Sequence, residues 1–102
     1  VLISGFTVNG RKSGETTMGE EGGKAEVCLD LKWTFPLAYA EIITGDGRET
    51  KRRRVDLSTT GSFGEVSLKI DADVTDQRWL RVEVWDVATN GAFTQPVWLN
   101  RR

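Results

Sequence analysis

The sequence predicts an all-β protein, an antiparallel β-sandwich of the immunoglobulin or fibronectin type III architecture with about seven strands. Three observations predict it. Strand-like runs with apolar residues at alternate positions follow one another along the chain. Turn signals separate these runs about every 8–14 residues. No segment shows the 3.6-residue period of an amphipathic helix. The Cys…Trp…Cys pattern of antibody domains is absent, so only the architecture is predicted, and a small closed barrel is the alternative.

Length and charge limit the number of domains and the kinds of partner that the chain can have. The 102 residues predict a single domain over residues 1–102, long enough to bury a core without disulfides. The 14 basic and 15 acidic side chains give a net charge of −1, so the basic excess that nucleic acid or an anionic membrane requires is missing. No apolar run approaches the roughly 18 residues of a membrane span, and no signal peptide is visible. Because the first residue is Val1 and not Met, we expect a C-terminal fragment of a longer protein.

The first 24 residues predict one strand and one long loop. Residues 1–10 form an opening strand with a bulge or bend at Gly5, and the strand closes on an Asn-Gly turn. Residues 11–24 are rich in glycine and predict a loop with one short extended piece near Thr16–Met18. Its length exceeds that of most connections, which favours an interface role, although a plain solvated loop is the simpler interpretation.

Residues 24–33 give the clearest strand. Five apolar residues alternate with polar ones and predict a half-buried antiparallel strand: Ala25, Val27, Leu29, Leu31 and Trp33. Cys28 is the single cysteine, so no intrachain disulfide can form, and we expect it to be a small buried core residue. Pro36 ends this strand by biasing Phe35 towards extended geometry.

Residues 38–57 predict a hairpin around Gly45-Asp46-Gly47. The second arm carries Lys51, Arg52, Arg53 and Arg54, so it is charged on both faces. Natural sheets protect an edge strand in this way, and we therefore predict an edge. The functional alternative, a basic patch for phosphate or nucleic acid, is less favoured because acids lie nearby and aromatic residues do not interleave.

The last strands carry most of the aromatic residues. Residues 63–72 predict a strand with Val66, Leu68 and Ile70 on one face. In residues 79–86, apolar side chains alternate with Arg81 and Glu83. Charged side chains cannot be buried unpaired without a large cost, so the core face must be the one with Leu80, Val82 and Val84.

The final turn is predicted at Asn90-Gly91, because both residue types tolerate positive φ. The strand that follows has Phe93, Val97 and Leu99 as apolar candidates. Pro96 cannot donate a ladder hydrogen bond, which places this strand at an edge or interrupts it.

Composition excludes most catalytic chemistry. The chain has no histidine, which removes Ser-His-Asp and Cys-His triads, imidazole bases and ordinary zinc sites. Among fifteen acids some pair will reach the spacing of a glycosidase by chance. The acidic segments lack the spacing of an EF-hand loop. We therefore predict no catalytic residue, no metal ligand and no cofactor, and expect this fragment not to be an enzyme.

Tryptophans are the remaining candidates for function. Trp33 continues a core face and is expected to be structural. The interaction candidates are Trp79, Arg81, Trp85, Pro96 and Trp98. Outward-facing tryptophans on a sheet indicate a surface that something covers. They either pack against another domain or stack on sugar rings, and packing is favoured because sugar stacking usually requires a row of aromatic residues on one accessible face.

The segment RVEVWDVATNGAFTQPVWL (81–99) resembles the C-terminal end of metal-dependent hydrolases of the PHP (polymerase and histidinol phosphatase) type, and more closely the metallohydrolase group with carbaryl and melamine-pathway relatives. The matching positions are Arg81, Glu83, Gly91, Ala92, Thr94, Pro96, Val97 and Trp98, and Gln95 replaces the usual asparagine. The segment TVNGRKSGETTMG (7–19) is similar to the glycine-bearing start of the same accessory domain.

This resemblance implies an accessory β-sandwich that follows a histidine-rich metal-binding barrel, in a parent chain that hydrolyses phosphoester or amide bonds. No metal-binding histidine is present here, so no catalytic residue carries over. The implied partner is the catalytic domain of the same polypeptide or of a neighbouring subunit, with no nucleic acid and no membrane. The alternative is an independent carbohydrate- or ligand-binding module that uses the surface tryptophans.

Overall fold

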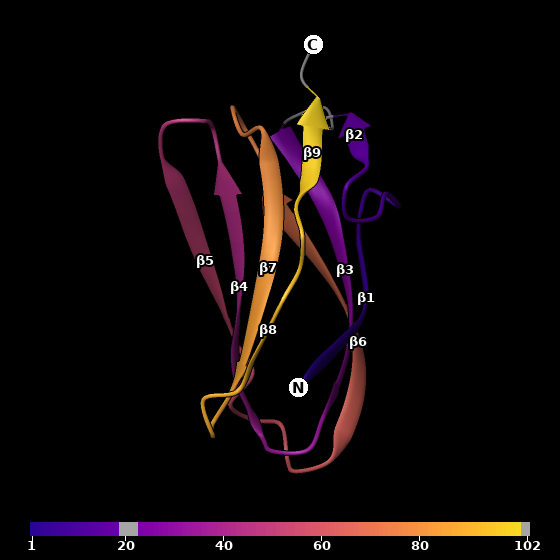
Figure 1. Ribbon diagram of the computed structural model, residues 1–102, viewed down its shortest axis with the longest axis vertical. Coiled ribbons are helices and arrows are strands. Elements are labelled where there is room, and N and C mark those ends of the chain that lie inside the picture. The colour runs from indigo at the N-terminus through magenta and orange to yellow at the C-terminus, as the bar shows by residue number, and fades with distance from the viewer. Residues whose placement is uncertain (19–22, 101–102) are drawn as a thin grey trace.

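The computed structural model describes residues 1–18 and 23–100, and in this part of the chain it shows nine strands in two sheets and no α-helix (Figure 1). The strands are β1 (Leu2–Val8), β2 (Thr16–Met18), β3 (Lys24–Trp33), β4 (Leu37–Gly45), β5 (Thr50–Asp56), β6 (Gly64–Asp73), β7 (Trp79–Asp86), β8 (Gly91–Phe93) and β9 (Val97–Asn100). The smaller sheet has the order β1-β3-β6 and the larger one β2-β9-β7-β4-β5, while β8 pairs with β7. The predicted all-β sandwich is confirmed. No helix in the described ranges is long and apolar enough to cross a membrane.

In the smaller sheet, β3 is the central strand and pairs antiparallel with both neighbours. Its alternation is as predicted, because Ala25, Val27, Leu29 and Leu31 are at most 1% exposed and face the other sheet. The predicted bulge is confirmed as a register shift between Ile3 and Gly5. A side chain at position 5 would collide with the Asp30 carboxylate, which explains the glycine.

In the larger sheet, β7 lies between β4 on one side and β8 and β9 on the other. Leu80, Val82 and Val84 are fully buried, so the predicted core face is confirmed. The predicted hairpin is also confirmed as β4 and β5, and β5 is an edge strand. Ala40 and Ile42 lie on the inner face of β4. They belong to the same hydrophobic core as the buried residues of the smaller sheet, so one core lies between the two sheets.

Two predicted Asn-Gly turns have different outcomes. Asn9 and Gly10 both have positive φ, 49° and 81°, as a tight hairpin turn requires. The second turn is confirmed, because β7 and β8 pair as a hairpin, but the positive φ of 64° is at Thr89 and Gly91 already belongs to β8. The Asp86 side chain accounts for the difference: its carboxylate accepts hydrogen bonds from the main-chain N–H groups of Ala88 and Asn90 and holds the turn one residue earlier.

Cys28 corrects the expectation of a buried thiol. It is half-buried on the outer face of β3, and its Sγ donates to Glu26 Oε1 at 3.6 Å. The alternation of β3 explains the placement, since the flanking residues Val27 and Leu29 take the core positions.

The last predicted strand is divided by Pro96, as expected, into β8 and β9. Between β8 and β9, Thr94 forms two hydrogen bonds to β7: its N–H donates to Val82 O, and its Oγ1 accepts from Val82 N. β9 then pairs with β7 and, on its other edge, in parallel with β2, the short extended piece predicted inside the first loop. Residues 19–22 of that loop lie outside the described residues.

Candidate interaction surfaces

Four of the five predicted interaction residues lie on the outer face of the larger sheet. Trp79 lies in register between Gly45 of β4 and Trp98 of β9, so two tryptophans are cross-strand neighbours. Arg81 follows two residues further along β7, and Trp85 lies near the other end of the strand. Pro96 lies in the connection between β8 and β9, where its main-chain O accepts from Gly14 N.

Trp79 and Trp85 are half-buried, because each indole ring lies over a glycine of the neighbouring strand. The Trp79 ring contacts Gly45, and a Cβ at Gly91 would lie 2.8 Å from Cζ3 of Trp85. Trp85 also packs edge-on against Phe93, with ring centroids 5.4 Å apart at an interplanar angle of 71°. Trp33 uses the same device on the other sheet, where it lies over Gly64. Each of these rings packs against the neighbouring strand of its own sheet, and only part of the ring is exposed to solvent.

Glu83 is the centre of an ion-pair network between the tryptophans. Arg81 Nη1 donates to Glu83 Oε2 at 2.7 Å and Trp85 Nε1 donates to Glu83 Oε1 at 3.3 Å. Arg52 of β5 lies 3.9 Å from Glu83 and 3.7 Å from Glu41. Burial acts to raise the pKa of Glu83, but the hydrogen bonds from Arg81 and Trp85 and the arginine charges outweigh it and hold the pKa below its ordinary value.

Arginine side chains also close the middle of this outer face. Ile43 points away from the main core yet is fully buried, and its register partners are Arg52 and Arg81. Long arginine stems cover apolar surface while their charged ends stay in water. Arg54 lies over the Tyr39 ring, 3.8 Å from its centroid. The centre of this face is therefore covered by the protein's own side chains.

Trp98 is the predicted residue that remains most open, with 47% of its surface exposed. It lines a depression of about 940 Å³ at the end of the sandwich where β9 ends. The other lining residues come from β2, from the β4–β5 turn, from the β6–β7 connection and from β9: Thr16, Asp46, Arg48, Asp76, Arg78 and Leu99. Hydrogen bonds from the main-chain N–H groups of Glu49 and Arg48 lower the pKa of Asp46, which stabilises the turn at this rim.

The opposite end of the sandwich exposes large apolar side chains, which sequence reasoning missed. We call this surface the apolar end, and its residues are Leu2, Phe35, Phe63 and Val87. Main-chain hydrogen bonds bring the connections together, from Phe63 N to Thr34 O and from Val87 N to Pro36 O. The connections between β3 and β4, β5 and β6, and β7 and β8 all reach this end (Figure 1). The available signal was a large apolar residue inside each of these polar connections, namely Phe35, Phe63 and Val87.

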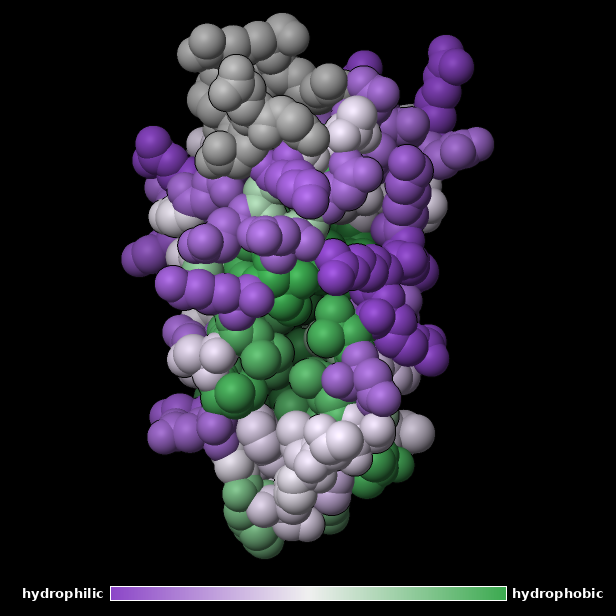
Figure 2. Space-filling model, turned by 180° about the vertical axis from the view of Figure 1, so that it is seen from behind, coloured by the Kyte–Doolittle hydropathy of each residue, from purple (hydrophilic) through white to green (hydrophobic). Residues whose placement is uncertain are grey.

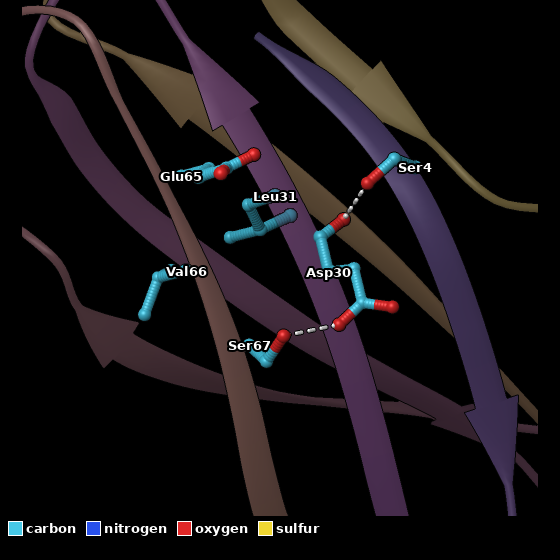
Figure 3. A pocket seen from close by; sticks show the side chains of 6 residues that line it. All are labelled: Ser4, Asp30, Leu31, Glu65, Val66 and Ser67. Carbon is cyan, nitrogen blue, oxygen red and sulfur yellow. Dashed lines mark hydrogen bonds between the residues drawn. The ribbon is translucent and has the colours of Figure 1, made fainter.

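A second hollow, shown in Figure 3, lies on the outer face of the smaller sheet. Ser67 Oγ donates to Asp30 Oδ1 at 2.6 Å, and Ser4 Oγ donates to the main-chain O of Asp30 at 3.2 Å. These bonds connect β1, β3 and β6 around the bulge, so the geometry is that of a structural tie. Within the described ranges, no group of three His, Cys, Asp or Glu side chains is placed to hold a metal ion.

Comparisons with known proteins give no relatives. No protein-family model, no curated protein and no solved structure matches this chain.

Proposed function

We propose that this chain is a non-catalytic accessory domain that packs, through its apolar end, against the catalytic domain of a PHP-type metal-dependent hydrolase. The proposal includes the immunoglobulin and fibronectin type III architecture. The strand order supports this part, because the first, third and sixth strands form one sheet and β4, β5, β7 and β9 belong to the other. This is the division of strands A, B and E from strands C, C′, F and G in such sandwiches.

One residue, Phe63, carries the docking proposal. Its side chain is 78% exposed, the largest exposed fraction among the large apolar residues that the structure describes as exposed. Its φ of 56° is in the left-handed region, which costs a residue with a Cβ roughly 1–2 kcal/mol. An aromatic ring kept both strained and in water does not stabilise the isolated domain, and strain of this kind is concentrated at functional positions. A contact that covers Phe63 explains both features.

The place of Val1 supports a domain of the same polypeptide as the occupant. Its main-chain N lies 3.9 Å from Asp86 Oδ2, next to Val87 of the apolar end. A domain joined before Val1 therefore meets this end first. Covering one large apolar side chain contributes about 1.5–3 kcal/mol before ordering costs. The sequence resemblance described above supplies the PHP-type identity of that domain.

The test compares this chain with the longer polypeptide that contains it. In the isolated chain, Phe63→Gly should raise the free energy of unfolding by about 1 kcal/mol, because glycine relieves the strained φ. In the longer polypeptide the same change should increase amide hydrogen exchange at residues 34 and 35 and in residues 60–63. The control is Phe93→Ser, which removes another exposed phenylalanine outside the apolar end and should leave that exchange unchanged.

Two results would overturn the proposal. One is an open reading frame with no domain before Val1. The other is equal amide hydrogen exchange of residues 34 and 35 in the isolated and the longer chains. Phosphoester hydrolysis that depends on a divalent metal in the longer polypeptide, and that is absent from this chain alone, would support the PHP-type assignment.

A second candidate function is the binding of a neutral sugar at Trp98. Its exposed ring beside two carboxylates and two guanidinium groups, those of Asp46, Asp76, Arg48 and Arg78, combines an apolar platform with polar groups that orient hydroxyls. Equal numbers of each charge favour a neutral ligand. Retardation in gels containing neutral polysaccharide, lost in Trp98→Ala and kept in Trp33→Phe, would support it, and equal retardation of the two variants would contradict it.

A further inference from the structure

One open side of the sandwich lies between β5 and β6. β6 pairs with β3 along all ten of its residues, and no described strand pairs with its other edge. β5 is likewise the last strand of the larger sheet. Two sheet edges therefore face each other without a strand between them.

The main chain of β6 offers hydrogen-bonding groups to this open side. Arg53 Nη1 of β5 donates to the main-chain O of Asp71 at 2.7 Å, so this carbonyl points away from β3. In an antiparallel strand the N–H and C=O of one residue point to the same edge, and successive residues alternate between the two edges. The residues that present both groups to the open side are therefore Glu65, Ser67, Lys69, Asp71 and Asp73.

The floor of the open side is apolar. Val66, Leu68 and Ile70 of β6 and Val55 of β5 pack against the core and yet stay partly exposed. Figure 2, which views the molecule from behind, shows hydrophobic side chains gathered in a hollow in the middle of this face and bordered by hydrophilic ones. β6 has no inward-pointing charge among these residues, although such a charge is how edge strands usually prevent pairing.

Positive charge borders the hollow on the β5 side. Lys51 and Arg53 are the register partners of Thr44 and Ile42, whose side chains are buried, so both cations lie on the inner face of β5. Together with Ala72 and Asp73 they line a cavity of about 240 Å³. An incoming segment thus meets apolar side chains along β6 and two cations beside them.

We propose that the open edge of β6 binds an extended segment of a partner protein whose hollow-facing residues are apolar, except for one acidic residue beside Lys51 and Arg53. The segment adds to the smaller sheet as its fourth strand, the position that strand D fills beside strand E in constant-type immunoglobulin sandwiches. Its main chain pairs with the outward main-chain groups of β6 and replaces Arg53 at the main-chain O of Asp71. Its apolar side chains fill the hollow, and its inward-facing carboxylate pairs with Lys51 and Arg53. This is recognition by β-strand addition, with affinity from the main chain and specificity from alternate side chains.

The experiment uses two acetylated, amidated eight-residue peptides in which threonine alternates with the inward-facing residues. The last three inward-facing residues are valine, and the first, which lies beside Lys51 and Arg53, is glutamate in the acidic peptide and lysine in the basic one. Amide hydrogen exchange of the protein is followed by NMR as each peptide is added. The acidic peptide should slow exchange at positions 65, 67, 69, 71 and 73 and leave positions 66, 68 and 70 unchanged, because the latter already pair with β3. It should bind about tenfold more tightly than the basic peptide, which corresponds to about 1.4 kcal/mol.

Two variants separate strand addition from adhesion to any apolar surface. Leu68→Lys places a charge in the hollow and should abolish binding, while Glu65→Lys, its control, adds the same residue on the outer face and should keep it. If Leu68→Lys fails to fold, Arg53→Glu replaces it and should reverse the preference from the acidic to the basic peptide. Equal affinity for the two peptides, protection without the alternating pattern, or dimerisation of the protein through β6 would each overturn the proposal.

Discussion

Glycines determine where the tryptophans of β7 come to rest. Gly45 lies beneath Trp79 and Gly91 beneath Trp85, each on the strand next to β7. Neither glycine has a positive φ in the structure, so the reason for glycine is space and not backbone conformation. The Asn-Gly pattern at Gly91 predicts a turn, whereas the structure shows that the neighbouring Trp85 ring requires a glycine there.

The substitution Gly91→Ala tests this reason. The new methyl group would lie 2.8 Å from the Trp85 ring, closer than carbon atoms normally approach. We expect the free energy of unfolding to fall by about 1–3 kcal/mol, as in other overpacked sites. The control is Gly61→Ala, where no atom lies within 4 Å. Urea denaturation measures both, and an equal effect of the two changes would contradict the packing explanation.

Asp86 makes stability depend on pH. The residue is 3% exposed, and burial acts to raise its pKa. Hydrogen bonds from Asn90 and Ala88 outweigh burial and hold the pKa below the ordinary value of 3.8. A lowered folded-state pKa means that the stabilisation is complete above the unfolded-state pKa and is lost as the pH falls through the folded-state value.

The expected result follows for Asp86→Asn. The variant should be less stable than the natural sequence at pH 7, because a neutral amide loses the charge-assisted hydrogen bonds. The difference should shrink as the pH falls below 3.8 and the native carboxylate becomes protonated. Urea denaturation at pH 7 and pH 3 measures it, and a difference that stays constant would be evidence against this role for the charge.

At the scale of elements, β5 shows how an edge strand is protected. Its charged side chains serve different purposes: Arg52 and Arg54 pair with Glu41 on the outer face, while Arg53 crosses the open side to Asp71. The basic run predicted an edge strand, and the structure confirms it. Which arginine faces the core side depended on the register between β4 and β5, which the sequence pattern did not provide.

Replacing Arg53 should weaken this protection. In Arg53→Val the inward-pointing charge is lost and the apolar hollow gains a side chain that favours strands. We expect self-association that increases with protein concentration, measured by size-exclusion chromatography with light scattering. Arg54→Val, on the opposite face of the same strand, is the control and should stay monomeric. Association of both variants to the same degree would point to lost net charge instead.

At the scale of the whole molecule, β3 and β7 hold the two sheets together. Each is paired on both edges and contributes fully buried side chains to the core. β5 pairs on one edge only, and most of its residues are exposed. We expect amides of β3 and β7 to exchange only on global unfolding and those of β5 to exchange by local opening. Native-state hydrogen exchange measures the order, and β5 amides as slow as those of β7 would contradict it.

Much of the fold could be predicted from single strands. The alternation in β3 and β7 gave their core faces, because a two-residue period fixes which side chains share a face. Pro96 gave the division of the last strand, because proline lacks the N–H that the ladder needs. The position of the β7–β8 turn could not be predicted in the same way, because it depends on hydrogen bonds from main-chain N–H groups to the Asp86 side chain. The pattern of apolar and polar residues does not show such bonds.

Alternation, proline and turn residues are enough to predict a β-sandwich and the limits of most of its strands. The lack of histidine is enough to exclude chemistry that needs an imidazole. Which surfaces are exposed is seen only in the folded protein. Trp79 and Trp85 pack on glycines, whereas Phe63 and the outer edge of β6 are not covered by described residues in this way. The physical reason is that alternation reports on one strand and its two faces. Whether a face is covered depends on residues that the fold brings from distant positions, and those contacts have no period in the sequence.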